Sequence, residues 1–385
     1  MRRFNLACIT VTTILVISAL YTPQPLLPTL RAAFGVSPPT AALLITVAML
    51  PLGVAPLVYG LLLGKVSPLT MTRVAVLLLA LSQAAIAVTD SFGLLLGLRL
   101  LQGLCIPAAL TALMTTMSSE SSDQGLGRTM ALYVSATIVG GFCGRFVSGV
   151  VASFFGWRAA FATLGLALLL NFALLLKFKI KASPVRAEPI SLSRMRLVLG
   201  HPGFLRVYLT IFCLFFVFAA VVNFLPFRLS EFSTAHQELR AAFVYLGYLA
   251  GLAASLSSTR MVPHLGGPAR AMLLGLLAYL GSVLLFLIPM EFSLYLTMFL
   301  FCGSMFFVHS TAPGLLNARE RSQAGVVNGL YIAFYYLGGT FGSWLPGYVY
   351  RLFGWHMFVL LLSAMLLVAV LLASGTKRQL ERAAL

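Results

Sequence analysis

Long apolar runs separated by short polar segments dominate this chain. An α-helix crosses the hydrocarbon core of a bilayer, about 30 Å thick, with about 20 residues. Runs near that length are found at 6–28, 40–63, 71–89, 92–115, 129–152, 157–177, 205–227, 240–259, 269–289, 292–314, 324–347 and 354–374. Proline, glycine, serine and asparagine in the separators favour loops. The pattern therefore predicts an all-α membrane protein with twelve transmembrane helices.

Composition supports this class. Of 385 residues, 60% are hydrophobic and 9% are charged, against about 25% charged residues in soluble proteins. The start, Arg2-Arg3 before an apolar run, resembles a signal peptide. Because Tyr21-Thr22-Pro23-Gln24-Pro25 follows it instead of a small-residue cleavage site, we expect a retained first helix.

The net charge of +17 raises the possibility of nucleic-acid binding, but the basic residues stand one to three at a time between apolar runs. Counted with the N-terminus inside, 19 of the 26 lie in cytoplasmic segments and 5 in outer loops. Cytoplasmic loops of membrane proteins carry such an excess. We therefore expect no nucleic-acid partner, and a multi-pass protein of a bacterial-type inner (plasma) membrane with both termini cytoplasmic.

The longest hydrophilic stretch lies midway along the chain and divides it. We predict an N-terminal six-helix half at 1–178, a basic cytoplasmic linker at 179–204, a C-terminal six-helix half at 205–376 and a cytoplasmic tail at 377–385. A solvated loop is the favoured interpretation of the linker. The alternative is a short amphipathic helix on anionic lipid, because Met195, Leu197 and Val198 interleave with Arg194 and Arg196.

An internal repeat appears when the chain is shifted by 198 residues. Eleven residues match in one register, from Gly127 on Gly325 to Phe155-Gly156-Trp157 on Phe353-Gly354-Trp355. The glycines of this repeat predict close helix packing. The packing set is Gly140, Gly141, Gly144, Gly149, Gly338, Gly339 and Gly342. Two repeated halves of one orientation commonly expose a midplane site to each side in turn.

Several motifs resemble those of one family, the major facilitator superfamily. Arg99-Leu100-Leu101-Gln102-Gly103 matches its R-x-x-Q-G pattern, and Tyr21–Pro28 resembles the start of twelve-helix exporter-like members. The run Gly140–Gly144 with Gly149 resembles the fifth-helix motif of proton-coupled exporters, without its usual proline. The resemblance covers essentially the whole chain. It implies a secondary transporter in two pseudo-symmetric six-helix halves.

The loop at Gly60–Leu69 departs from the family pattern G-x-L-A-D-R-x-G-R-K. Only a glycine, a leucine and one basic residue remain, and Gly64 stands at the position of the acid. The usual cytoplasmic charge relay is therefore incomplete. This loop is the reason for keeping open a degenerate relative that no longer transports.

Candidate coupling or gating residues are the ionisable side chains inside the spans. None of the nine acids lies at a predicted midplane. Arg99, Arg145 and His309 lie within spans, where a charge is costly unless it has a partner. The competing interpretation for Arg145 is hydrogen bonding to backbone carbonyls of the glycine-rich helix, and for Arg99 it is a structural contact at a helix end. For the histidine it is packing. With an unperturbed pKa of about 6.5, His309 is the candidate proton carrier.

Polar and aromatic residues predict where a central cleft would be lined. The candidates are Tyr21, Gln24, Asn223, Asn328, Tyr331, Tyr335 and Tyr336. Pro23, Pro25 and Pro28 are expected to break the first span and to free carbonyls, which is tolerated beside a cavity.

The leading functional prediction is efflux of a small organic molecule by alternating access, as a proton antiporter. The first alternative is a carrier of an anionic metabolite, because arginines and no acids lie inside the spans; the second is the degenerate relative. No Walker A motif, metal-ligand spacing or nucleophile–base set occurs. We therefore expect no enzyme, metal or cofactor. Expected partners are the substrate, protons and membrane lipid, and we expect a monomer.

Overall fold

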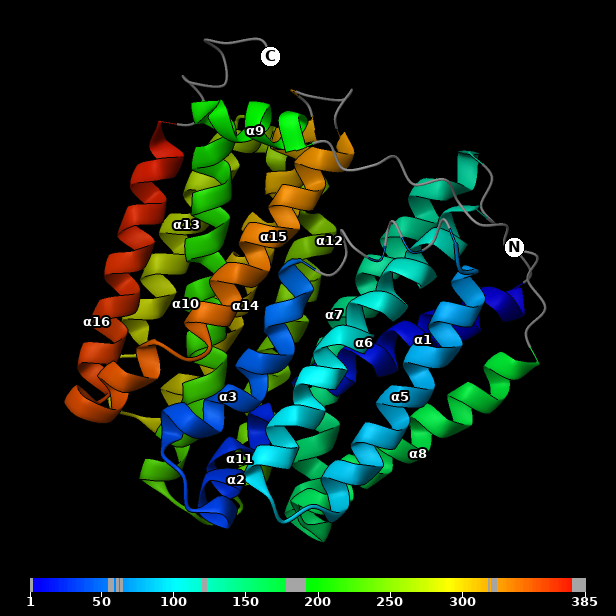
Figure 1. Ribbon diagram of the computed structural model, residues 1–385. Helices are drawn as coiled ribbons and strands as arrows, with labels where there is room; N and C mark the ends of the chain where they lie inside the picture. The colour runs from blue at the N-terminus through cyan, green and yellow to red at the C-terminus, as the bar shows by residue number, and fades with distance from the viewer. Residues whose placement is uncertain are drawn as a thin grey trace. The chain divides into compact units, whose positions relative to one another are not determined.

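The computed structural model describes residues 3–54, 59, 62, 65–119, 123–177, 192–317, 319 and 324–375, and they form helices and turns without a strand (Figure 1). The predicted tail, the first half of the predicted linker (179–191) and four residues of the loop at Gly60–Leu69 lie outside this part. Ten helical segments within it are long and apolar enough to cross a membrane.

The helices follow the predicted runs in order. In the N-terminal part they are α1 (Arg3–Tyr21), α2 (Leu27–Phe34), α3 (Pro38–Met49), α5 (Pro68–Val88), α6 (Phe92–Ser119), α7 (Asp123–Phe155) and α8 (Trp157–Leu176). The C-terminal part contains α9 (Leu192–Gly200), α10 (Pro202–Phe232), α11 (Gln237–Val244), α12 (Tyr248–His264), α13 (Pro268–Leu285), α14 (Glu291–Asn317), α15 (Ala324–Gly342) and α16 (Pro346–Ser374). Each of the twelve predicted runs overlaps at least one helix.

Two of the predicted runs differ from the ten long apolar segments. The second is the shorter apolar helix Pro38–Gly53, which joins α3 to a 3-10 turn. The eleventh is α15, a helix of 19 residues that include several glycines and tyrosines. Most of the described residues of both runs are helical.

Serine–proline pairs begin two of the helices. The Ser37 hydroxyl accepts a hydrogen bond from the Thr40 N–H at the start of α3, and Ser67 does the same for Thr70 at the start of α5. Proline follows each serine, at the first helical turn, where its missing N–H costs nothing. These short polar separators therefore act as helix starts.

The prolines of the first span break it, as the sequence predicts. Helix α1 ends at Tyr21, a 3-10 turn spans Gln24–Leu26, and α2 begins at Leu27. Because Pro23 has no N–H, it cannot donate to the carbonyl oxygen of Ala19 four residues earlier. That oxygen needs another donor, which the first candidate site provides.

The interpretation of the whole linker as a solvated loop is wrong for residues 192–200, which form the helix α9. Val198 of α9 is fully buried, while Leu197 is 54% exposed. Burial of one face against the protein explains why this short segment is helical, since isolated helices of such length are marginal in water.

Contacts group the chain into two compact units. The first unit contains residues 1–189 and 233–242, and the second contains 190–232 and 243–385. In the first, α1 packs on α7, and α5 packs between α6 and α8; in the second, α10 packs on α15 and α16, and α14 packs on α12 and α13. Segment 233–242, which follows α10 in sequence, belongs to the first unit: Thr29 donates to the Glu238 carboxylate.

The repeat extends to the contacts that its glycines make. In the first unit, a Cβ on Gly144 would come within 2.6 Å of the Ser18 carbonyl oxygen on α1. In the second unit, a Cβ on Gly342 would overlap the backbone of Phe216 on α10. Phe216 is Ser18 shifted by the same 198 residues. The repeated glycines therefore mark a repeated helix pair, α1 with α7 and α10 with α15.

The shared Phe-Gly-Trp motif has the same backbone conformation in both units. Gly156 has φ 81° and Gly354 has φ 77°, a left-handed conformation that side chains other than hydrogen disfavour. Gly156 separates α7 from α8, and Gly354 interrupts α16. Each glycine turns the chain before the last helix of its unit.

Candidate functional site

Arg99 of α6 lies fully buried in the first unit and is surrounded by backbone carbonyls. Its guanidinium donates to Ala19 O at 2.8 Å, Leu20 O at 2.5 Å and Leu44 O at 2.7 Å. Ala19 O is the carbonyl that Pro23 leaves without its helical donor. Arg99 therefore caps the broken end of α1 and ties it to α3. These bonds support a structural contact at a helix end for Arg99, and its gating role stays a prediction.

The rest of the R-x-x-Q-G motif completes this contact. The Gln102 side chain accepts from Arg99 at 2.5 Å and donates to the Ser82 hydroxyl of α5 at 2.8 Å. A Cβ on Gly103 would come within 2.5 Å of the Ala48 carbonyl oxygen. Glycine therefore lets α6 approach α3 closely enough for Arg99 to reach Leu44.

Arg145 of α7 forms a second buried cluster in the first unit. Its guanidinium carbon lies 3.8 Å from the centre of the Tyr21 ring, within the range of a cation–π contact. One N–H donates to the Gln24 side-chain oxygen and another to Gly141 O at 2.5 Å. The structure thus brings together three residues that the sequence proposed separately, Tyr21, Gln24 and Arg145.

Gly141 explains how this cluster fits. A Cβ there would lie 3.3 Å from the Arg145 guanidinium and 3.8 Å from the Tyr21 ring. Gln24 is fully buried, Arg145 is 1% exposed and Tyr21 is half-buried. The cluster therefore holds a cation behind an aromatic ring that retains some exposed surface.

In the second unit, His309 of α14 and Tyr331 of α15 are bonded to each other. The Tyr331 hydroxyl lies 2.7 Å from His309 Nδ1 and 3.1 Å from the His309 carbonyl oxygen. Its single hydrogen can be donated to either of these acceptors. Tyr331 is buried, and His309 retains exposed surface. With Nδ1 accepting, a neutral His309 carries its proton on Nε2. With the hydroxyl donating to His309 O instead, Nδ1 can carry the proton, so the contact allows either tautomer.

Aromatic rings surround this histidine. Its ring centre lies 4.5 Å from that of Tyr335, which stacks on Phe215 of α10. Tyr336 meets Phe215 and Tyr335 edge-on. Tyr335 and Tyr336 are half-buried. Three predicted residues of α15 therefore form one aromatic wall with His309.

The two candidate asparagines, Asn223 and Asn328, bond to partners outside the aromatic wall around His309. Asn328 exchanges two hydrogen bonds with Asn317, at 3.0 and 3.3 Å, near the junction of α14 and α15. Asn223 is fully buried and donates to Ser343 O at 3.0 Å. Both amides therefore join neighbouring helices.

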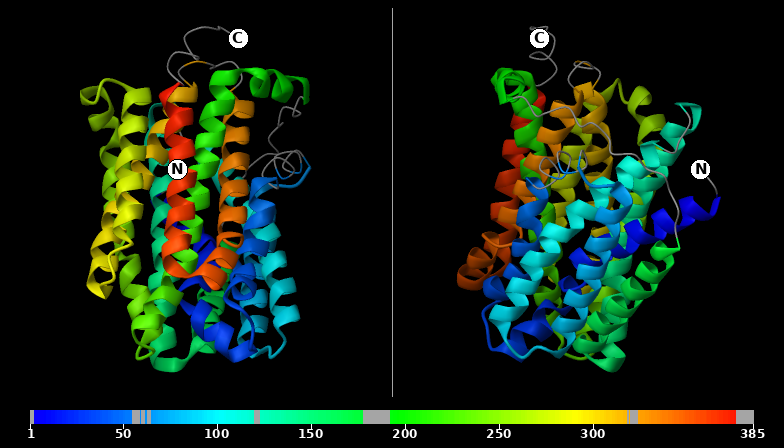
Figure 2. Two further views of the ribbon diagram at one scale, coloured as in Figure 1. Left: turned by 90° about the vertical axis from the view of Figure 1, so that its left-hand side faces the viewer. Right: turned by 45° about the vertical axis from the view of Figure 1, so that its right-hand side comes forward.

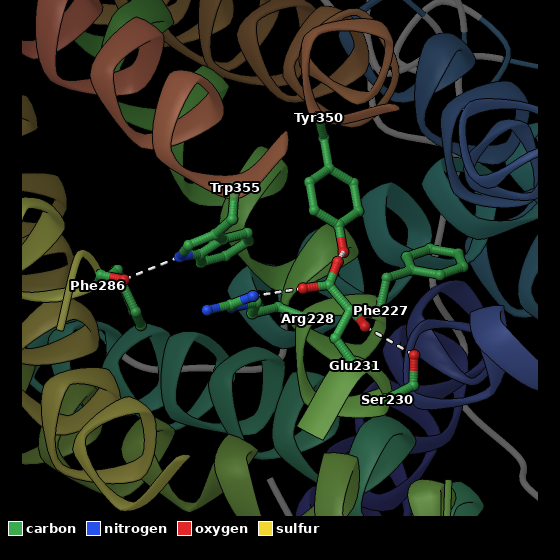
Figure 3. Close-up of polar contacts among 7 residues, drawn as sticks. All are labelled: Phe227, Arg228, Ser230, Glu231, Phe286, Tyr350 and Trp355. Carbon is green, nitrogen blue, oxygen red and sulfur yellow. Dashed lines mark hydrogen bonds and ion pairs between the residues drawn. The ribbon is translucent and has the colours of Figure 1, made fainter. Parts of the chain in front are cut away.

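A charged cluster at the end of α10 lies among residues that the sequence assigned to a loop (Figure 3). The Glu231 carboxylate accepts from Arg228 and from the hydroxyl of Tyr350, and the Trp355 N–H donates to Phe286 O at 2.8 Å. Helix α10 continues to Phe232, so Arg228 and Glu231 lie one turn apart. In the sequence, their opposite charges three residues apart indicate that the helix continues through them. The cluster ties α10 to α16.

No metal site is found in the part of the chain that the structure describes, since no three His, Cys, Asp or Glu side chains group there.

Comparison with known proteins identifies the class. The sequence profile of the Major Facilitator Superfamily matches residues 9–320. The chain belongs to this family of membrane transporters. The predicted all-α fold and the assignment as a transporter, not an enzyme, are confirmed.

Two curated relatives span most of the chain. YybF of Bacillus subtilis, an uncharacterized MFS-type transporter, is 26% identical over 369 residues, which cover 94% of this chain and 90% of YybF. The inner membrane transport protein YnfM of Escherichia coli K12 is 27% identical over 367 residues, with 94% and 88% coverage.

Two solved structures share the fold. A bacterial homolog of the human lysosomal transporter Spinster, inward-facing and unoccupied, superposes with TM-score 0.78 at 14% identity, covering 99% of this chain and 97% of its own. The nucleoside transporter NupG gives TM-score 0.81 at 11% identity, with 97% and 99% coverage. At these identities the likeness concerns the fold alone.

Proposed function

We propose that this protein exports a small organic molecule by alternating access, in exchange for protons. The observation that supports a substrate path is that several polar side chains within the apolar helices retain exposed surface. They are Tyr21 in the first unit and His309, Tyr335 and Tyr336 in the second. Lipid tails offer polar groups no hydrogen-bond partner, so this partial exposure supports contact with water in each unit.

His309 is the residue we propose for proton coupling. Its Nδ1 is engaged by the Tyr331 hydroxyl, so a proton would be gained on that nitrogen only if the Tyr331 hydroxyl turned its hydrogen away. The hydroxyl has a second acceptor, His309 O, at 3.1 Å. Protonation of His309 would therefore switch Tyr331 from one acceptor to the other. This gives the coupling a local structural change in α14 and α15.

Direction and orientation rest on the sequence. The excess of basic residues in alternate loops supports cytoplasmic termini and a bacterial inner membrane. The likeness of Gly140–Gly144 to the exporter motif supports efflux. A single chain contains both units, and we propose that it works as a monomer.

Transport by the purified protein in proteoliposomes tests this function. A chemically diverse set of labelled compounds is screened with an imposed pH gradient, and one compound is expected to accumulate against its own gradient. His309→Gln is expected to abolish the pH-driven accumulation while exchange of labelled for unlabelled compound continues. His264→Gln is the matched control, because His264 is exposed at the end of α12.

Two outcomes would overturn parts of this proposal. Unchanged pH-driven accumulation in His309→Gln would remove the histidine from coupling. A folded protein that moves no compound under any gradient would favour the degenerate, non-transporting relative.

A carrier of an anionic metabolite is the second candidate, and Arg145 favours it. The guanidinium is 1% exposed and contacts the Tyr21 ring and the Gln24 side-chain oxygen. A guanidinium binds a carboxylate through charge-assisted hydrogen bonds, which is the chemistry an anionic metabolite would use here. Arg145→Gln is expected to abolish binding of anionic compounds and to retain binding of neutral ones. Equal loss for both kinds would contradict an anion site.

A further inference from the structure

One end of the second unit is positively charged. Neither the proposed coupling at His309 nor the proposed anion binding at Arg145 involves this end. Helices α10, α12, α13, α14, α15 and α16 all begin or end there. Five exposed arginines gather at it, Arg194, Arg196, Arg260, Arg270 and Arg319. Arg206 lies against Gly375 at the end of α16. The described residues of this end, within 192–206, 256–272, 314–319, 324–328 and 370–375, include no Asp or Glu.

Helix α9 lies across this end instead of along the bundle. Figures 1 and 2 show it at a steep angle to α10, and it contacts both α10 and α15. The turn between the helices is well defined: His201 is 6% exposed, and its Nδ1 accepts the Gly203 N–H at 3.1 Å. Because α10 and α15 cross the bilayer, a helix across their ends runs parallel to the membrane surface.

The exposed face of α9 combines charge with an apolar side chain. Val198 is fully buried and anchors the helix to the second unit, while Leu197 is 54% exposed. At about 100° per residue, Leu197 projects between Arg194 and Arg196, about 60° from the first and 100° from the second. Both arginines are exposed. A leucine flanked by arginines suits the boundary between lipid headgroups and acyl chains.

We infer that α9 is a binding surface for anionic phospholipid, with Arg194 and Arg196 contacting the headgroup phosphates and Leu197 entering the acyl boundary. Cationic segments next to a membrane gain about 1 kcal/mol for each Lys or Arg near an anionic surface, which corresponds to roughly fivefold enrichment of the lipid for each arginine. The described residues of this end carry charge of one sign only, which strengthens the preference. A soluble acidic partner would not use the exposed leucine in this way.

The test places a tryptophan on α9 with Leu197→Trp in the full-length protein, alongside the parent protein with its three tryptophans. Two sets of vesicles contain the same mixture of phosphatidylglycerol and phosphatidylcholine. In one set the phosphatidylglycerol carries brominated acyl chains, which quench tryptophan fluorescence; in the other set the phosphatidylcholine does. The difference in quenching between Leu197→Trp and the parent reports the lipid next to α9.

We expect brominated phosphatidylglycerol to quench the introduced tryptophan at least fivefold more effectively per mole than brominated phosphatidylcholine. Added Arg194→Gln and Arg196→Gln should bring the ratio to one. Arg260→Gln with Arg270→Gln removes the same charge from the same end and should leave most of the preference. Rising salt should weaken the preference for phosphatidylglycerol in the protein that retains Arg194 and Arg196, because exposed charges are screened.

Equal quenching by the two lipids would overturn the inference, as would equal loss of preference in both arginine pairs. No quenching by either lipid would mean that α9 faces water or a soluble partner. The salt titration keeps the inference testable if the double variant does not fold. The assay needs no substrate and is independent of the transport proposal.

Discussion

The two units use the same packing at matched positions and different polar chemistry beside it. Gly140 and Gly144 lie against Ile14 and Ser18 in the first unit, and Gly338 and Gly342 lie against Phe212 and Phe216 in the second. All four pairs agree with a shift of 198 residues. The position next to Gly144 is Arg145, whereas the position next to Gly342 is Ser343.

This difference separates what the repeat specifies from what each unit does. Arg145 is bonded to Gln24, while Ser343 accepts from Asn223 through its carbonyl oxygen. Arg99 corresponds to Thr297. The charged clusters inside the membrane are therefore in the first unit, and the aromatic wall around His309 is in the second. Close backbone contact requires glycine at the matched packing positions of both units, but the side chains next to these positions can differ.

The largest expected effect is loss of Arg99. Arg99→Ala leaves Ala19 O, Leu20 O and Leu44 O without this donor, and a buried polar group without a partner costs about 1–3 kcal/mol. We expect unfolding to become easier by about 3 kcal/mol or more. Thr297→Ala at the matched position of the second unit should cost much less. Thermal unfolding in detergent measures both.

A stable Arg99→Ala protein that fails to transport would contradict the capping role. It would restore gating as the function of this arginine.

The next effect tests whether the glycine contacts are equivalent. Gly144→Ala places a methyl group against the backbone of Ser18, and Gly342→Ala places one against the backbone of Phe216. Such overpacking costs about 1–3 kcal/mol of stability. Gly97→Ala and Gly281→Ala are the matched helical controls, because a Cβ at either position meets nothing within 4 Å. We expect the first pair to lower the unfolding temperature and the controls to keep or raise it.

If only one member of the first pair is destabilising, the units do not pack equivalently. The comparison between them would then hold for the sequence but not for the energetics.

A smaller effect is expected from Asn223→Ala, which removes one buried hydrogen bond to Ser343 O. The loss should be about 1 kcal/mol in unfolding free energy, with the substrate affinity unchanged. A changed substrate affinity at unchanged stability would instead support the prediction that Asn223 lines the cleft.

The smallest effect concerns the exposed end of the first unit, where Arg158 pairs with Asp90. Their side chains are 46% and 89% exposed, and exposed ion pairs contribute about 0–1 kcal/mol. Arg158→Gln should therefore leave stability nearly unchanged in a thermal melt. By contrast, Glu231→Gln should cost more, because Tyr350, which donates to Glu231, is buried.

Much of the fold could be predicted from the sequence because the bilayer imposes strong constraints. Apolar length fixed the helical runs, and the prolines after Tyr21 predicted the break in the first span. The linker was the main error. Residues 192–200 are helical because Val198 is buried against the second unit, and this depends on a surface that hydropathy does not reveal.

The candidate site could be predicted only in part. Residue type selected Arg145, Tyr21 and Gln24, but their mutual contact depends on the room left by Gly141. The pairing of His309 with Tyr331 joins helices α14 and α15. Arg228 and Glu231 were assigned to a loop because the apolar run ends before the helix does.

The sequence by itself determined the class of protein, its helical runs and its two repeated parts, since burial in lipid requires long apolar helices and close packing requires glycine. Only the tertiary structure decided which polar groups meet. Residue type alone does not show that Arg99 donates to the carbonyl oxygens of Ala19, Leu20 and Leu44. Hydrogen bonds act over about 3 Å, and helix periodicity does not position side chains of different helices to that precision.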